Sequence, residues 1–97
     1  MVLHTTSTDT QLFGSDGTFL RTIGQGLLNG PYGVCVDSRG RVYVASCYSK
    51  SVVVMDQTGT QLAAIAVPGE PVGVLVTRAG KVVVSIREGP SALVVMQ

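Results

Sequence analysis

Short runs of apolar, mostly β-branched residues recur along this chain, and each is bounded by Gly, Pro, Ser or Asp. The runs are Val34–Val36, Val42–Ala45, Val52–Met55, Val74–Val76, Val82–Val84 and Leu93–Met96. Runs of this length and composition predict β-strands. Because successive positions are apolar, both faces of each strand must be covered. The connections are too short for the crossover helices that parallel strands require, so the pattern predicts an all-β, antiparallel fold.

The turns between these runs share one feature, a glycine placed late in a short loop. It occurs in Ser15–Gly17, Asp37–Gly40, Gln57–Gly59 and Thr77–Gly80. A type I turn that is closed by a left-handed glycine joins neighbouring strands into hairpins. The turns therefore support antiparallel pairing of consecutive strands.

The chain also repeats itself with a period of 40 to 42 residues. Pro31–Val44 returns as Pro71–Val84, with Pro, Gly, Val, Val, Gly, a basic residue, Val and Val in register. Leu12–Ile23 is echoed in the same way by Val54–Ile65. This period is typical of the four-stranded blade of a β-propeller, whose blades stack face to face and so cover both sides of each sheet.

One stretch of the repeat resembles a known family. Pro-x-Gly-Val-x-Val-Asp-x-x-Gly-Arg-Val-Tyr-Val-Ala over residues 31–45, followed by Val-Val-Val-Met-Asp-x-x-Gly and Leu-x-x-Ile65, resembles the NHL repeat. The second copy matches less well, because Thr77 replaces Asp37 and Glu88-Gly-Pro90 interrupts a loop. In Ser46–Lys50 the chain also lacks the Asp and Asn that the family usually places in the loop between the second and third strands. The resemblance implies a partial propeller made of four-stranded antiparallel NHL-type blades.

We label the strands of a blade a to d and predict four segments. They are a flexible leader at 1–9, a partial blade with strands c and d at 10–24, a first NHL blade at 30–66, and a second blade lacking its d strand at 70–97. NHL propellers typically close with six blades. Three alternatives remain open: a fragment of a longer propeller, a homotrimer in which each N-terminal d strand completes a neighbouring blade, and a weakly stable partial fold.

Composition narrows the class of protein further. Charged residues make up 13% of the chain, about half of the usual share, and the net charge is only +1. The molecule as a whole therefore lacks the field that would attract a strongly charged partner. The longest apolar runs fall far short of a membrane span, and the first ten residues do not form a signal peptide. We expect a cytoplasmic protein without a membrane partner.

The sequence offers little catalytic chemistry. His4 is the only histidine, and Cys35 and Cys47 are twelve residues apart with no histidine near them. The aspartates fall at strand ends and turns, where Asp is common because it bonds to the local backbone. Gly24-Gln-Gly26 lacks the third glycine of a dinucleotide loop. We expect no enzyme activity, no metal site and no cofactor.

Two surfaces are candidate binding sites. At one end of the stacked blades, the d–a and b–c loops carry Tyr32, Tyr48, Lys50 and Arg87, a mixture that binds peptides or stacks bases. At the other end, the a–b turns carry a basic stripe of Arg39, Arg41, Arg78 and Lys81, which suits RNA phosphates. The plain alternative for both sets is solvated loop and turn residues.

Two functions follow from these surfaces and from the resemblance. The first is a non-catalytic scaffold that binds a protein or peptide, including substrate recognition in a ubiquitin-ligase context, because NHL propellers occur in tripartite-motif ligases. The alternative is a propeller surface that binds single-stranded RNA. The near-neutral charge favours the scaffold, and the basic stripe favours RNA.

Overall fold

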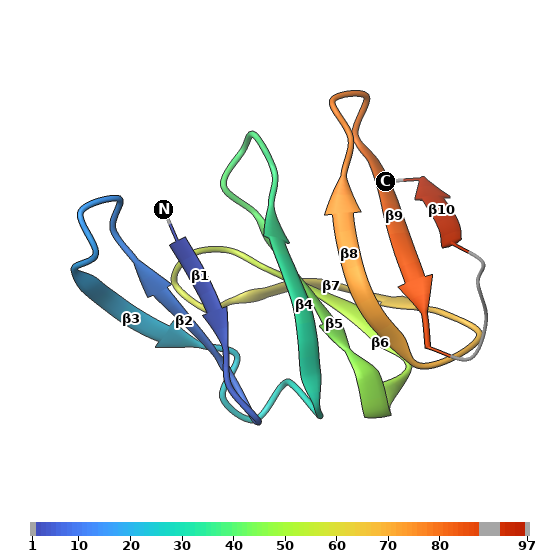
Figure 1. The fold of residues 1–97 in the computed structure, drawn as a ribbon, viewed down its shortest axis with the longest axis horizontal. Coiled ribbons are helices and arrows are strands. Elements are labelled where there is room, and N and C mark those ends of the chain that lie inside the picture. Colours follow the sequence, from blue (N-terminus) through green and yellow to red (C-terminus); the bar gives the residue numbers. More distant parts are fainter. Residues whose placement is uncertain (1, 88–91, 97) are drawn as a thin grey trace.

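Three antiparallel sheets stacked side by side make up the structure, a computed structural model (Figure 1). It describes residues 2–87 and, for the backbone alone, residues 92–96. The described part of the chain contains ten strands and one short 3-10 helix, and it contains no α-helix. The all-β prediction is confirmed, and the stacked sheets form part of a β-propeller. No helix in the described residues has the length and apolarity needed to cross a membrane.

The first sheet has three strands, β1 (Val2–Thr5), β2 (Thr10–Phe13) and β3 (Phe19–Ile23), in that order. β1 lies within the stretch that we expected to be a flexible leader, and it pairs with β2 so that Leu3 faces Leu12. The sequence signal was weak because this strand is only four residues long and is interrupted by His4. This sheet therefore contains strands b, c and d of a blade.

The middle sheet has all four strands of a blade, in the order β4-β5-β6-β7. Its strands are β4 (Pro31–Val36), β5 (Val42–Ser46), β6 (Ser51–Met55) and β7 (Gln61–Ala66). The 3-10 helix η1 (Cys47–Ser49) joins β5 to β6. This sheet is the one that the NHL-like pattern covers most fully.

The third sheet comprises β8 (Pro71–Val76), β9 (Lys81–Ile86) and β10 (Ala92–Met96), in the order β10-β9-β8. It corresponds to strands a, b and c. The homotrimer alternative is not supported, because it required that each neighbour supply only the missing d strand. The N-terminal d strand instead belongs to a three-stranded sheet, so the two terminal sheets together hold six strands where one blade has four.

Two apolar clusters hold the sheets together. The first core cluster, between the first and middle sheets, is Leu12, Ile23, Leu28, Val42, Val44, Val53 and Met55. The second core cluster, between the middle and third sheets, is Tyr43, Val52, Val54, Val67, Val82 and Val84. Full burial of a side chain of this size contributes about 1.5 to 3 kcal/mol. Covering both faces makes all five residues of β5 buried, which is what the continuous apolar run predicted.

β4 and β8, the a strands of the middle and third sheets, approach each other closely at a glycine in each strand. A Cβ atom added to Gly33 would lie only 2.8 Å from the Gly73 Cα atom. These two glycines occupy equivalent positions of the repeat, forty residues apart. The close approach explains why the a strand carries glycine in the middle of an otherwise β-branched run.

Candidate functional site

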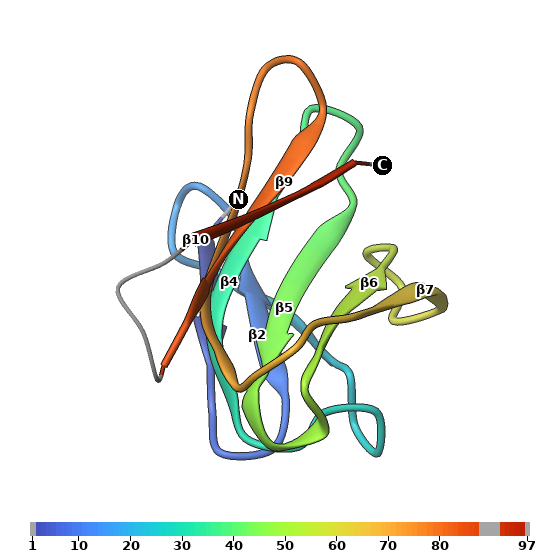
Figure 2. The ribbon, with the colours of Figure 1, turned by 90° about the vertical axis from the view of Figure 1, so that its right-hand side faces the viewer.

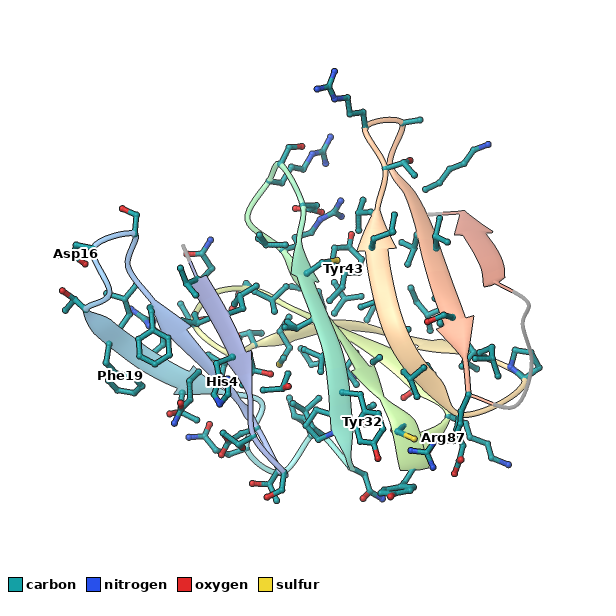
Figure 3. The ribbon with its side chains drawn as sticks, in the orientation of Figure 1. His4, Asp16, Phe19, Tyr32, Tyr43 and Arg87 are labelled. Carbon is teal, nitrogen blue, oxygen red and sulfur yellow. The ribbon has the colours of Figure 1, made fainter. Side chains whose placement is uncertain are left out.

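Three of the four predicted loop residues form a compact group, the loop-face cluster, which consists of Tyr32, Tyr48 and Arg87. The Arg87 Cζ atom lies 5.1 Å from the centre of the Tyr32 ring and 5.9 Å from that of Tyr48. The residues come from β4, from η1 and from the position directly after β9. Figure 3 shows Tyr32 and Arg87 near each other, at the end of the molecule opposite the β4–β5 and β8–β9 loops. Contacts of this kind between a guanidinium and an aromatic face are attractive.

Backbone contacts fix the Tyr48 ring in place. A Cβ atom on Gly30 would come within 2.5 Å of Tyr48 Cδ2, so the ring packs directly on this glycine, whose φ is +67°. The Tyr48 N–H donates to the Asn29 carbonyl oxygen at 3.0 Å. Ser46 accepts a hydrogen bond from the Asn29 N–H at 2.9 Å and one from the Ser49 hydroxyl at 2.7 Å. Serine hydroxyls thus brace the loop in which the family usually has Asp and Asn.

Arg87 is anchored while its head group stays accessible. Its N–H donates to the Glu70 carbonyl oxygen at 2.9 Å, and its Nη1 lies 3.4 Å from Glu70 Oε1. Desolvation lowers the pKa of Arg87, but Cys47, Tyr32 and Glu70 outweigh it and raise the pKa above its ordinary value. The Tyr32 and Tyr48 side chains are 48% and 55% exposed, so the cluster can meet a ligand.

Lys50 belongs to the same end of the molecule but stands apart from the cluster. It has a left-handed backbone with φ of 53°, and its carbonyl oxygen accepts the Val67 N–H at 3.0 Å. No ion pair joins its exposed side chain to another described residue. Glu70, which pairs with Arg87 beside the cluster, was not predicted from the sequence. The sequence did contain a signal for this pairing, because Glu70 is the one acid in a d–a loop and the neighbouring loops carry basic residues.

The four residues of the basic stripe do not all face the same way. A cleft of about 680 Å³, the turn cleft, separates the a–b turns of the middle and third sheets. Its lining consists of Val36, Asp37, Ser38, Arg39, Arg41, Val76, Thr77, Arg78, Ala79 and Gly80. Lys81 is outside this lining. It alternates along β9 with the buried Val82, so its side chain projects from the opposite face of the third sheet.

Asp37 organises one wall of the turn cleft. Its carboxylate accepts hydrogen bonds from the backbone N–H groups of Arg39 and Arg41, both at 2.9 Å. It also accepts from Arg41 Nε at 2.6 Å and from the Tyr43 hydroxyl at 3.0 Å. Burial alone raises the pKa of Asp37, but the bonds from Arg41, Tyr43 and Arg39 outweigh it and lower the pKa below its ordinary value. Arg41 is therefore already paired.

Cys35 and Cys47 are both free thiols. Burial, together with the nearby Asp37 charge, raises the pKa of Cys35 to about 11, so this thiol stays protonated and unreactive at neutral pH. Within the described part of the chain, no three residues of the His, Cys, Asp and Glu types gather closely enough to hold a metal ion.

Comparison with known proteins relates part of the chain to two animal proteins. It is 42% identical over 52 residues to the B-box type zinc finger protein ncl-1 of Caenorhabditis elegans. It is 38% identical over 52 residues to the protein brain tumor of Drosophila melanogaster. Each match covers 54% of this chain but only 6% and 5% of the respective relatives. No protein-family model matches the chain.

Among solved structures, the chain is similar to hydrazine synthase of Kuenenia stuttgartiensis, with a TM-score of 0.73 at 19% identity. The superposition covers 82% of this chain and 23% of that chain. At this level of identity the likeness concerns the fold alone. It agrees with the assignment of the three stacked sheets to a partial β-propeller.

Proposed function

We propose that the chain is a non-catalytic binding scaffold whose loop-face cluster contacts a protein or peptide partner. The observation that carries this proposal is the Arg87 guanidinium, which is held against two exposed tyrosine rings. Tyr and Arg are enriched at the energetic centres of protein interfaces, since Tyr brings large contact area at low entropic cost and Arg brings several hydrogen-bond donors. The packing on Gly30 and the hydrogen bonds around Ser46 order the surface before a partner arrives, which reduces the cost of binding.

Charge at this end of the molecule favours a protein partner over a nucleic acid. Glu70 lies beside Arg87, so part of the positive charge is balanced locally. The similarity to a B-box type zinc finger protein, of which the match covers only 6%, supports a place for this scaffold within a longer protein. The NHL-like pattern adds a ubiquitin-ligase context, in which the scaffold would recognise the substrate.

A displayed peptide library tests the proposal. We expect peptides selected on the intact chain to lose at least tenfold in affinity for Tyr48→Ala and for Arg87→Ala, because each substitution removes a central contact. Leu62→Ala is the matched control, since Leu62 is similarly exposed, at 50%, but lies on β7 away from the cluster. Thermal melts would establish that all three variants fold. Peptides that bind both cluster variants within twofold of the parent chain would refute the proposal.

Single-stranded RNA binding along the a–b turns is the second candidate function. The observation that favours it is the excess of cations at these turns, where Arg39 and Arg78 line the turn cleft and have no ion pair with another described residue. Two phosphate contacts would give about a sevenfold loss of affinity for a fourfold rise in salt.

Fluorescence anisotropy with a short oligouridine would measure this dependence. We expect Arg39→Glu and Arg78→Glu to weaken binding and to flatten its salt dependence, because each reversal removes a phosphate contact and adds repulsion. Arg21→Glu, on the distant β3, serves as the control for net charge. Affinity that responds neither to salt nor to the two reversals would exclude this function.

A further inference from the structure

The turn cleft holds two arginines whose charge nothing nearby balances. Figure 1 and Figure 2 both show the β4–β5 and β8–β9 loops at the same end of the molecule, and the cleft lies between them. Asp37 is the only acidic residue in its lining, against Arg39, Arg41 and Arg78. The volume of about 680 Å³ is within the range of sites that bind small molecules.

The Asp37 carboxylate is already saturated. It accepts four hydrogen bonds, two of them from Arg41, and its side chain is only 5% exposed. It therefore neutralises Arg41 and leaves the guanidinium groups of Arg39 and Arg78 unpaired among the described residues.

The equivalent turn of the third sheet lacks this acid. Thr77 stands where Asp37 does, and among the described residues its hydroxyl oxygen accepts the Lys81 N–H alone, at 3.1 Å. The Ala79 N–H corresponds to the Arg39 N–H that Asp37 caps, but no described residue accepts a hydrogen bond from it. Because Thr77 stands in place of an aspartate, this wall of the turn cleft keeps an unbalanced positive charge and a free N–H donor.

We infer that the turn cleft binds a phosphomonoester group, with Arg39 and Arg78 as its charged ligands. A phosphomonoester carries a charge of about −1.5 to −2 at neutral pH and has three terminal oxygens, which match two guanidinium groups in charge and in number of acceptors. A phosphodiester, as in RNA, has a single charge and two such oxygens. The hydroxyls of Ser38 and Thr77 also line the cleft and can donate to the ligand.

The test is titration of the whole chain with inorganic phosphate, with O-phosphoserine, and with a short glycine-serine peptide that contains phosphoserine. We expect binding that shifts the amide resonances of Gly40 and Gly80, the glycines of the two turns. Arg39→Gln and Arg78→Gln should each weaken binding about tenfold or more. Neither side chain forms an ion pair with another described residue, so we expect both variants to fold, and thermal melts would check this. Lys81→Gln is the matched control, because it removes the same charge from the same turn on the opposite face of the sheet.

Acidity separates this ligand from RNA. The lining contains no histidine, the side chain that ordinarily titrates between pH 5 and pH 8, and its charged residues are Asp37, Arg39, Arg41 and Arg78. The second ionisation of a phosphomonoester has a pKa of about 6, so binding should weaken as pH falls through that value. Binding of oligouridine should not change, since its diesters do not titrate there.

Four results would overturn the inference. The first is a loss of affinity for Lys81→Gln equal to that of the arginine variants, and the second is binding of sulfate as tight as that of phosphate. The third is an affinity for phosphoserine that does not change with pH, and the fourth is binding of oligouridine without binding of phosphoserine. Tighter binding of the phosphopeptide than of inorganic phosphate would support a phosphorylated protein as the source, and the reverse order would support a free phosphate compound. Tyr48→Ala should leave all these titrations unchanged, so the outcome is independent of the loop-face proposal.

Discussion

Gly33→Ala should lower the free energy of unfolding by about 3 kcal/mol. The added Cβ atom would lie 2.8 Å from both the Gly73 Cα atom and the Val72 carbonyl oxygen, and 3.3 Å from the Val74 nitrogen. All three are backbone atoms of β8, so only a separation of the middle and third sheets relieves the clash. That separation loosens the second core cluster. Urea denaturation monitored by circular dichroism measures the change.

Gly73→Ala is the matched control for this prediction. It makes the same chemical change at the equivalent position of the repeat, but its Cβ atom meets the Ser85 hydroxyl at 2.6 Å, and that side chain can rotate away. We expect a cost below about 1 kcal/mol, because alanine also reduces the entropy of the unfolded chain. Equal losses for the two variants would show that the close approach of β4 and β8 does not limit stability.

Asp37→Ala should lower the free energy of unfolding by a similar amount, about 3 kcal/mol, because it removes the acceptor of four hydrogen bonds. Two of them come from Arg41, one from its backbone N–H and one from its guanidinium. The Asp37 side chain is only 5% exposed, so water replaces its hydrogen bonds poorly. Asp56→Ala is the control, since Asp56 caps the β6–β7 turn through Thr58 and Thr60 without a cation. We expect it to cost clearly less, and equal costs would contradict a special role for the Asp37 network.

The same network sets a dependence on pH. The pKa of Asp37 in the folded state lies below the value of about 3.9 in the unfolded chain. The contribution of its carboxylate to the free energy of unfolding is therefore complete above about pH 3.9 and is lost as pH falls through the folded-state pKa. The free energy of unfolding, measured between pH 7 and pH 3, should therefore fall less steeply with decreasing pH for Asp37→Asn than for the parent chain. Parallel profiles would show that the carboxylate charge contributes nothing.

The strands of the middle sheet could be predicted because local chemistry determines them. Two-sided apolar runs require cover on both faces, and the forty-residue repeat identifies the source of that cover. β1 was not predicted because this four-residue strand, which contains His4, has neither a continuous apolar run nor a match to the repeat. Only its pairing with β2 makes it a strand. Missing β1 also made the homotrimer look feasible.

The candidate sites show the same division. The exposure of Tyr32, Tyr48 and Arg87 could be predicted, although Tyr32 lies on β4 and not in a loop, but their mutual distances depend on how two sheets stack. Arg39 and Arg41 look alike in sequence, and only the fold shows that the Arg41 guanidinium pairs with Asp37 while the Arg39 guanidinium does not. The orientation of Lys81 was available from its alternation with the buried Val82 and Val84, although that signal was not used.

The alternation of side chains in β5 and β6 has a consequence for folding accuracy. Val42 and Val44 serve the first core cluster, whereas Tyr43 between them serves the second, and Val53 and Val54 divide in the same way. A slip of one residue in pairing would therefore exchange the contents of both clusters at once and would push the Tyr43 ring into space shaped for valine. Strands that are apolar on both faces are usually poor at specifying their alignment. Here the difference in size between the two faces supplies the missing information, and a single tyrosine carries most of it.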